Sequence, residues 1–356
     1  MIRIGFITPS SSSGHPARGI GFYSRQLLSA LKLRAGTYGM QVESVENFDN
    51  VIGRYNLIHQ PYFDLFSPSL PLVPPVKTIV TIHDVIPLEY PLHYPPGIKG
   101  RLGLVWEKTA IRSVSRIITD SYASVKALVK YLHLPHAKIK LVYLAPGDQF
   151  RRITDKIRLS SVRNKYHLPR KFVLFMGDIN WNKNLPGLVE TCLNLKIPLV
   201  VIGKSAAEIE KLNLSHKELS HLSPLISHLS DPNLIRLGFV PDEDLAAIFS
   251  LAGIYCQPSF AEGFGLPVVQ AMACGTPVVC SRTHSLPEFA GEAAVYFDPF
   301  SVPDMTQKIK SVMTDSGLRK TLSEAGIIQS SRFTWEQSAD HTLQVYREVI
   351  KSGLLP

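Results

Sequence analysis

One stretch of twenty residues combines a carboxylate, an amide and an almost bare backbone. It reads FAEGFGLPVVQAMACGTPVV over residues 260–279, with Glu262 near its start and Gln270 in its middle. Pro267 suits the first turn of a helix, and Gly275 suits the left-handed position just after a helix ends. We therefore expect a loop that carries Glu262 and leads into a helix that contains Gln270.

The two glycines of this stretch indicate what the loop could bind. Gly263 and Gly265 leave the backbone bare before the expected helix, so a ligand could approach the N–H groups of its first turn. A helix start of this kind favours phosphate through its dipole and its donors together. The preceding run GIYCQPS is typical of a strand, which places the loop at the carboxyl edge of a sheet, where α/β folds bind ligands. The other interpretation is a tight turn whose small residues serve packing alone.

Two further polar residues follow expected strands. Lys183, in FMGDINWNKNLPGL, precedes a helix and could neutralise a phosphate, although a single lysine on a loop is usually just solvated. His83 ends the strand pattern TIVTIH and could donate a hydrogen bond or act as a base in a cleft. A structural histidine followed by a helix-capping Asp84 is the alternative for this position.

A glycine loop follows the opening strand pattern IRIGFIT. It reads SSSSGHPARGIGFYSRQLL, and Gly19 and Gly21 stand directly before a helical pattern. The spacing matches neither the dinucleotide fingerprint nor a phosphate-binding P-loop. The segment is therefore either a loop that closes over a ligand or a plain connection.

Short apolar strands alternate with helical patterns along the whole chain. This alternation predicts an α/β fold with parallel sheets. It breaks over residues 145–170, which are polar and basic, and then starts again with KFVLFMG. Because a chain of 356 residues exceeds the size of one typical core, we expect two similar halves joined by this segment.

The composition excludes several classes of protein. Hydrophobic residues make up 45% and charged residues 19%, as in ordinary globular proteins, and the four cysteines lack the spacing of a metal site. No apolar run is long enough for a signal peptide or a membrane span, so we expect a cytoplasmic protein, or one bound to the inner face of a membrane.

Positive charge is concentrated in the middle of the chain. The net charge is +9, and residues 99–171 hold 17 Lys or Arg against four acids. The aromatic spacing of single-strand binders is absent, so we expect no nucleic-acid partner. An anionic membrane surface and a merely solvated face remain the two interpretations.

Taken together, these stretches resemble family 4 of the retaining glycosyltransferases, an α/β family with the GT-B fold. The matching stretches are, in order, ARGIGFYSRQLL, TIHDVIPLEYP, RIITDSYAS, KIKLVYLAPGDQF, MGDINWNKNLPGLV, IRLGFVPDEDLAAIFSLA, SFAEGFGLPVVQAMACGTPVVCSRTHSLPEFAG and RFTWEQSA. The resemblance implies two facing Rossmann-like domains with an inter-domain cleft. An acceptor-binding domain would span residues 1–165 and a nucleotide-sugar-binding domain 166–335, with a C-terminal helix over 336–356 packing back on the first.

The resemblance also implies a role for each matching residue. Glu262 corresponds to the first carboxylate of the family's Glu-x7-Glu element, which contacts the donor sugar, and His83 to the histidine beside the transferred sugar. These two are the expected catalytic residues, and Lys183 corresponds to the lysine on the diphosphate. The other expected donor contacts are Gly19 and Gly21 in the N-terminal loop, Gly263, Phe264, Gly265, Leu266 and Gln270 in the opening stretch, and Ser285 and Glu288 in SLPEFAG.

The chain departs from the family pattern near these residues. Gln270 stands where the family has the second carboxylate, which holds the ribose hydroxyls. Asp178 replaces an arginine that many members carry, and Asn182 stands directly before Lys183. The grip on the diphosphate is therefore expected to rest on Lys183 and backbone amides.

The resemblance implies transfer of a hexose from a nucleotide-diphosphate sugar to an acceptor hydroxyl, with retention of configuration and without a metal or other cofactor. We expect mannose from GDP-mannose as the donor, and a saccharide or lipid-linked acceptor, in polysaccharide or glycolipid synthesis. Two alternatives stay open. A weakly active or inactive GT-B domain could serve as a binding scaffold, and a nucleotide-sugar epimerase or a phosphorylase could share the fold.

Overall fold

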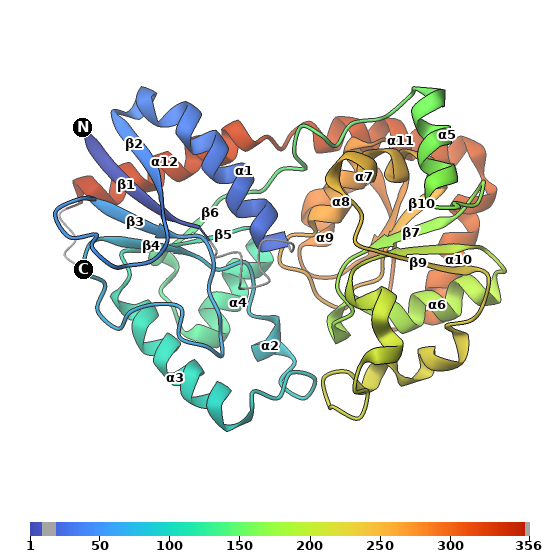
Figure 1. The fold of residues 1–356 in the computed structure, drawn as a ribbon, viewed down its shortest axis with the longest axis horizontal. Coiled ribbons are helices and arrows are strands. Elements are labelled where there is room, and N and C mark those ends of the chain that lie inside the picture. Colours follow the sequence, from blue (N-terminus) through green and yellow to red (C-terminus); the bar gives the residue numbers. More distant parts are fainter. Residues whose placement is uncertain (9–18, 353–356) are drawn as a thin grey trace. The chain divides into compact units, whose positions relative to one another are not determined.

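The computed structural model describes residues 1–8 and 19–352, which form two compact units (Figure 1). The first unit comprises residues 1–91, 95–145 and those from Phe333 onward, and the second comprises residues 92–94 and 146–332. Residues 9–18, which carry most of the predicted N-terminal glycine loop, lie outside the described residues.

The first unit is built on a six-stranded parallel sheet in the order β2-β1-β3-β4-β5-β6. Its strands are β1 (Ile2–Ile7), β2 (Met40–Val45), β3 (Leu57–Gln60), β4 (Thr78–Thr81), β5 (Arg116–Thr119) and β6 (Ile139–Leu141). Its α-helices are α1 (Gly19–Arg34), α2 (Ile86–Glu89), α3 (Gly97–Ser113), α4 (Tyr122–Leu132) and α12 (Trp335–Lys351). Figure 1 shows α1 and α12 on one side of this sheet and α3 and α4 on the other.

The second unit repeats this design with strand order β12-β11-β10-β7-β8-β9. Its strands are β7 (Val173–Met176), β8 (Leu199–Ile202), β9 (Leu234–Gly238), β10 (Ile254–Gln257), β11 (Val278–Ser281) and β12 (Ala294–Phe297). Its α-helices are α5 (Lys156–Lys165), α6 (Leu185–Asn194), α7 (Asp242–Leu251), α8 (Leu266–Ala273), α9 (Leu286–Ala290), α10 (Val302–Thr314) and α11 (Ser316–Ser330). The expected α/β fold with two Rossmann-like halves is confirmed.

The apolar strand sequences fit parallel sheets whose two faces are both covered by helices. In β3, β4, β8 and β10 every residue is buried, because helices cover both faces of a parallel sheet. The helices begin where local chemistry favours them: the Ser121 hydroxyl caps α4 and the Thr334 hydroxyl caps α12. All strands of a parallel sheet end at the same edge, so the loops that follow them gather polar residues there.

The division between the units falls at Ala145 and Pro146 rather than at the expected residue 165. The reason is α5, which lies against α7 of the second unit. Lys165 Nζ and the Tyr166 hydroxyl contact Asp244 Oδ2 at 2.7 and 2.8 Å. The basic segment was expected to close the first domain, but its helix packs with the second.

Helix α12 belongs to the first unit, although it follows the whole second unit in the sequence. It packs along α1, where Arg34 Nε donates to Asp340 Oδ1 at 2.5 Å. Its Tyr346 hydroxyl lies 2.6 Å from Nδ1 of His59, and both side chains are fully buried. The first unit therefore needs residues from both ends of the described chain.

Three further features bear on the functional classes. No helix among the described residues is both long and apolar enough to cross a membrane. Within the same residues, no group of three or more His, Cys, Asp or Glu side chains could hold a metal ion. All four cysteines are free and buried, and burial raises the pKa of the Cys274 thiol to about 12.

Candidate functional site

Glu262 lies in the loop between β10 and α8, at the carboxyl edge of the second sheet. Its side chain is buried, with 7% of the residue exposed. Strand β10 pairs with β7, so the loops after these two strands are neighbours although they are far apart in the sequence. The loop after β7 carries Lys183, in a short 3₁₀-helix over Trp181–Lys183.

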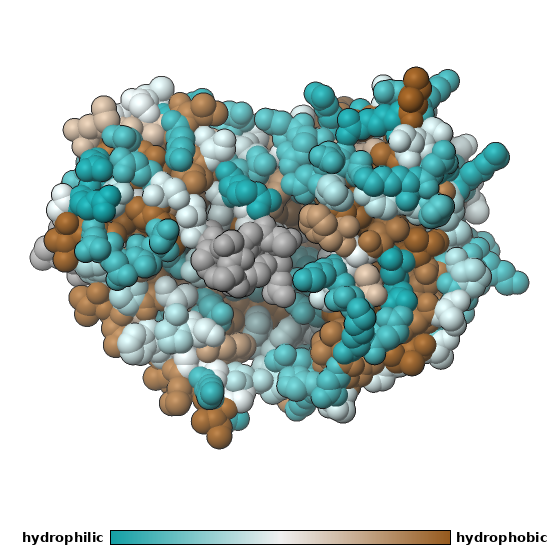
Figure 2. Space-filling model, in the orientation of Figure 1, coloured by the Kyte–Doolittle hydropathy of each residue, from teal (hydrophilic) through white to brown (hydrophobic). Residues whose placement is uncertain are grey.

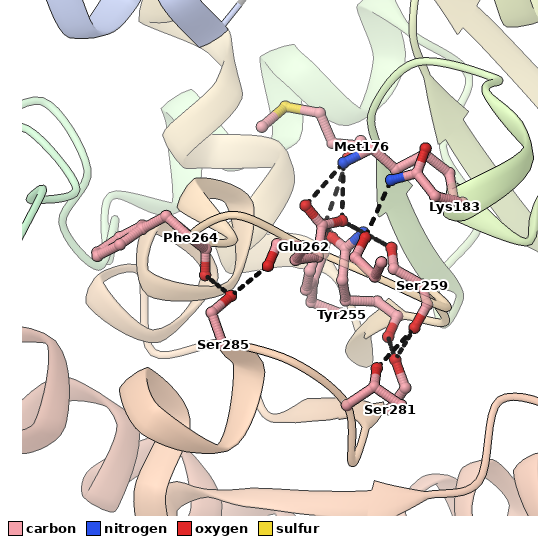
Figure 3. A network of polar contacts seen from close by, with 12 residues as sticks. Met176, Lys183, Tyr255, Ser259, Glu262, Phe264, Ser281 and Ser285 are labelled. Carbon is pink, nitrogen blue, oxygen red and sulfur yellow. Dashed lines mark hydrogen bonds and ion pairs between the residues drawn. The ribbon is translucent and has the colours of Figure 1, made fainter. Parts of the chain in front are cut away.

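Lys183 and Glu262 form an ion pair in which one ammonium meets both carboxylate oxygens. The Lys183 Nζ atom lies 2.7 Å from Glu262 Oε1 and 2.9 Å from Oε2 (Figure 3). The lysine side chain is 21% exposed and the carboxylate 8%. Because the pair is mostly withdrawn from water, its attraction is screened less than that of a surface pair.

Two more side chains hold the Glu262 carboxylate. The Ser259 hydroxyl and the Gln257 amide donate to Oε1 at 2.6 and 3.0 Å. The Gln257 amide oxygen in turn accepts a hydrogen bond from the Tyr255 hydroxyl. Oε1 therefore receives three donors, which fixes the carboxylate before any ligand arrives.

The loop that carries Glu262 is braced from β11 and the residues after it. Ser281 and Thr283 both donate to the Ser259 carbonyl, at 2.5 and 3.0 Å. The Ser285 hydroxyl is close to the carbonyls of both Glu262 and Phe264, at 2.9 and 3.0 Å (Figure 3). Ser285 was predicted to contact the donor. In the structure it is fully buried and its hydroxyl supports the turn.

The backbone after Glu262 turns sharply into α8. Gly265 has a φ of 97°, and a Cβ on this residue would lie 2.7 Å from a Leu286 methyl group, so only glycine fits here. No side chain caps α8 within the described part of the chain. In its first turn, which begins at Leu266, Pro267 has no N–H and the Val268 N–H bonds to the Gly265 carbonyl at 2.9 Å. The N–H groups of Gly265 and Leu266 are therefore the ones that have no partner within the helix.

The other residues predicted to contact the donor differ in their burial and packing. The Phe264 ring packs on Phe289, with 3.8 Å between ring centroids, so this residue offers its backbone rather than its ring. Gly263 is buried beside Glu262, and Leu266 is half-buried. Glu288 is half-buried on the short helix α9. The structure thus gathers the turn residues around the start of α8.

Gln270 lies inside α8 and is 4% exposed. Its Nε2 atom donates to the Pro146 carbonyl over 3.4 Å, a long hydrogen bond. Its Oε1 atom is buried and has no hydrogen-bond partner among the described residues. A buried acceptor of this kind is costly unless it is satisfied, so it could accept from a ligand hydroxyl.

Asn182, one of the departures from the family pattern, joins the two loops of the site. Its Nδ2 atom donates to the Ala261 carbonyl at 2.9 Å, and its carbonyl accepts from the Phe260 N–H at 2.7 Å. Its Oδ1 atom accepts from the Tyr94 hydroxyl at 2.6 Å. Asn182 therefore holds the Lys183 loop against the Glu262 loop, while Asp178 lies half-buried between β7 and this 3₁₀-helix.

In the first unit, His83 is paired with Asp120. Its Nδ1 atom lies 2.5 Å from Asp120 Oδ2, and the two residues follow the neighbouring strands β4 and β5. Burial opposes the charged imidazolium, but the charge and hydrogen bond of Asp120 outweigh it and raise the pKa of His83. His83 is thus a stronger base than a free histidine.

A buried network lies beside this pair. The Tyr23 ring meets His83 edge-on at 4.6 Å, and its hydroxyl lies 2.9 Å from Thr81 Oγ1. The same Thr81 atom lies 2.8 Å from Nε2 of His59, whose pKa burial lowers to about 3. The network therefore runs from His83, through neutral His59, to Tyr346 on α12.

Gly19 and Gly21 were predicted to lie in a loop before a helix. In the structure Gly19 is the first residue of α1 and Gly21 lies in its first turn. The expected loop residues before them lie outside the described range. The helix begins earlier than expected because glycine lowers helix propensity without excluding a helix that packs well.

Several residues that hold the predicted ones in place were not predicted from the sequence. Asp120 was visible as the polar residue after the strand pattern RIIT, on the strand next to that of His83. Gln257 and Ser259 had a weaker signal, since both are polar residues at the end of an apolar strand. Asn182 stands out in the sequence only as a departure from the family pattern. Its hydrogen bonds join the Lys183 and Glu262 loops, and these loops are neighbours only because β7 pairs with β10.

Two known families match the chain. The family described as Glycosyl transferases group 1 matches residues 160–348, which is more than half of the chain. The family described as Glycosyltransferase Family 4 matches residues 4–145. The two matches together cover both units.

Individual relatives agree with these families. O-antigen chain mannosyltransferase B of Escherichia coli is 28% identical over 291 residues, which are 76% of this chain and 70% of that protein. The serotype-specific mannosyltransferase WbdA of Escherichia coli is 27% identical over 288 residues, 78% of this chain, but the match spans only 34% of WbdA.

A solved structure shows the same fold. Sucrose-phosphate synthase from Thermosynechococcus elongatus superposes with a TM-score of 0.76 at 19% identity, over 99% of this chain and 100% of that one. The family match, the two Rossmann-like units and the braced turn before α8 point the same way. The chain therefore belongs to the glycosyl transferases of group 1 and to glycosyltransferase family 4, and is a glycosyltransferase with the GT-B fold.

Proposed function

We propose that this enzyme transfers mannose from GDP-mannose to the hydroxyl of a saccharide or lipid-linked acceptor, with retention of configuration and without a metal ion. The observation that carries the proposal is the Lys183–Glu262 pair, which is held by neighbouring side chains in the loop before α8. The sugar is proposed from the two Escherichia coli relatives, both of which are mannosyltransferases.

The groups of the second unit suit a sugar diphosphate. When the donor breaks, negative charge develops on the leaving diphosphate, and preorganised donors stabilise such charge. Lys183 supplies a cation, and the N–H groups of Gly265 and Leu266 at the start of α8 supply donors aligned with the helix dipole. These groups can balance a diphosphate without a divalent cation, which is why we propose metal-independent transfer.

Glu262 and His83 are proposed to act on the sugar. An ionised carboxylate only accepts hydrogen bonds, so Glu262 suits the hydroxyls of a hexose. Its fixed position means that little freedom is lost when the sugar binds. His83, made more basic by Asp120, is proposed to hydrogen-bond the transferred sugar, and the leaving phosphate to accept the acceptor's proton.

A donor panel tests the function. The protein is incubated with GDP-mannose, GDP-fucose, UDP-glucose and UDP-galactose, and released nucleotide and the melting temperature are measured with and without EDTA. We expect release and thermal stabilisation with GDP-mannose, both unchanged by EDTA. Saturation at a hundredfold excess over Kd adds about 2.7 kcal/mol to the free energy of unfolding. If no donor is hydrolysed or stabilises the fold, the scaffold alternative holds; the anomeric configuration of the product tests retention.

Replacing Gln270 by glutamate restores the carboxylate of the family pattern. A hydrogen bond to a charged group contributes about 1 kcal/mol more than a neutral one, so the KM for the donor should fall, by tenfold at most. The kcat should stay within about twofold, because ribose contacts are alike in the ground and transition states. Steady-state kinetics check both values. A hundredfold rise in kcat at unchanged KM would contradict the assignment of Gln270 to the ribose.

The same substitution has a structural cost. The new carboxylate loses the donor that reaches the Pro146 carbonyl, so the free energy of unfolding should fall by about 1–3 kcal/mol. Gln329→Glu is a matched control, because the Gln329 amide also donates to a backbone carbonyl, that of Phe289, at 2.8 Å. It should lower stability but leave the donor KM unchanged.

A further inference from the structure

Helix α3 exposes an apolar stripe where a surface helix of a globular protein normally exposes polar residues. Ile98, Leu102 and Val105 are 82%, 68% and 65% exposed, and Trp106 is 39% exposed. Their spacing of four, three and one residues places all four on one side of the helix. We call these four residues the apolar stripe.

The opposite face of α3 is already packed. Gly103 and Gly100 let the helix lie directly on Phe66: a Cβ on Gly103 would stand 2.1 Å from the Phe66 carbonyl oxygen. Ala110 and Ile111 are fully buried in the core of the first unit. Helix α3 is therefore packed on the core of its own unit, and the apolar stripe lies on its outer face.

The charges of α3 are divided between its two faces. Its one acidic residue, Glu107, is fully buried and accepts hydrogen bonds from the N–H groups of Ser69 and Leu70. Four cations remain, and on a helical projection Lys99 lies on one side of the stripe and Arg101, Lys108 and Arg112 on the other. The exposed face thus carries apolar and cationic side chains and no carboxylate of the helix.

The segment before α3 contacts the stripe at Trp106 and also exposes an apolar residue. The Trp106 indole donates to the Leu70 carbonyl at 2.8 Å, which fixes its ring at the border of the stripe. Val73, three residues further on, is 76% exposed. Figure 2 shows hydrophobic side chains along the edge where Figure 1 places α3.

We propose that α3 docks the first unit on an anionic membrane surface, lying in the plane of the lipid headgroups. An amphipathic helix with apolar residues flanked by Lys and Arg has the chemistry of such interfaces. Tryptophan favours the headgroup level, and the long basic side chains can reach lipid phosphates while their stems stay in apolar surroundings. This docking goes beyond the proposed function and does not depend on the identity of the donor.

The charges of this face favour a membrane over a second copy of the chain or a nucleic acid. A second copy of the chain, paired through the same face, would bring cations against cations, which disfavours association. A nucleic acid would meet the cations but leave Ile98, Leu102 and Val105 unmatched. A bilayer with anionic lipid matches both the apolar centre and the basic rim.

Sedimentation of the full chain with vesicles tests the proposal. Vesicles of phosphatidylcholine alone are compared with vesicles that contain 30% phosphatidylglycerol, at 0.1 M salt. We expect binding to the anionic vesicles and at least tenfold less with the neutral ones. Val105→Glu should lower the partition coefficient roughly tenfold or more, because an apolar contact is lost. Lys99→Gln with Arg101→Gln should lower it about 25-fold, at about fivefold for each cation.

A matched control and a spectroscopic signal complete the test. Ile328→Glu changes an equally exposed apolar residue, at 69%, on α11 of the second unit and should leave binding unchanged. Trp106 emission should shift to the blue with anionic vesicles, and the shift should vanish in Trp106→Phe. Circular dichroism melts confirm that the variants fold.

Four results would overturn the proposal. These are absence of binding by the wild type, equal binding to neutral vesicles, equal loss in Ile328→Glu and Val105→Glu, or a dimer that Val105→Glu dissociates. None of them bears on nucleotide release in the donor panel, so failure of the docking and failure of the proposed function can be told apart.

Discussion

Glu262→Gln is expected to lower kcat at least a hundredfold while the protein remains folded. The glutamine is nearly the same size, but its amide nitrogen would face donors where the carboxylate now accepts from Lys183, Ser259 and Gln257. Two or more charge-assisted hydrogen bonds, each contributing about 1.5–3 kcal/mol, are weakened or lost. The proposed contact of Glu262 with the sugar would strengthen as charge develops in the transition state, so the loss should appear in kcat more than in KM.

The measurement is donor turnover by released nucleotide, with thermal melts as a check on folding. Glu243→Gln is the control, since Glu243 is an exposed carboxylate on α7 and should behave as wild type. A Glu262→Gln enzyme whose kcat stays within threefold of wild type would remove this carboxylate from the reaction.

Lys183→Ala is the second change with a large expected effect. It removes the cation of the loop after β7 and leaves the buried Glu262 carboxylate without its counter-ion. We expect kcat/KM to fall at least a hundredfold and the free energy of unfolding to fall by about 1–3 kcal/mol, less than for a fully buried pair because Lys183 is partly exposed. Lys183→Arg should recover only part of the activity, because a planar guanidinium does not replace a compact ammonium.

A double-mutant cycle separates the pair from its members. Because Lys183 and Glu262 are in contact, the combined variant should lose less than the sum of the single losses. Lys320→Ala, an exposed lysine on α11, is the control for loss of charge alone. Fully additive losses in kcat/KM would show that the two residues act independently and would contradict a shared site.

The fold could be predicted well from the sequence because the patterns of strands and helices are local. Short buried strands that alternate with helical patterns predict parallel sheets, and both sheets are present. The boundary at residue 165 was misplaced for a non-local reason. The α5 sequence is polar, like a linker, and its packing on α7, which includes the contacts of Lys165 and Tyr166 with Asp244, shows that it belongs to the second unit.

The candidate site was predictable only in part. Glu262, Lys183 and the bare turn have a recognisable pattern, and the structure brings them together. Their contact depends on β7 lying next to β10, and strand order is set by packing over the whole sheet. The same holds for Asp120, since only the pairing of β4 with β5 brings it to His83. Side chains that hold a site residue from a distant part of the chain have no sequence pattern of their own.

The position of α12 has a consequence for how the protein is made. A ribosome produces residues 146–332 before it reaches Trp335, so the second unit can be complete while the first still lacks a helix. Until α12 arrives, His59 has no Tyr346 to bond and the side of the first sheet that α12 covers stays exposed. The half of the molecule that is synthesised first is therefore the half that finishes folding last, and it is during that interval that a nascent chain is most open to aggregation and chaperones.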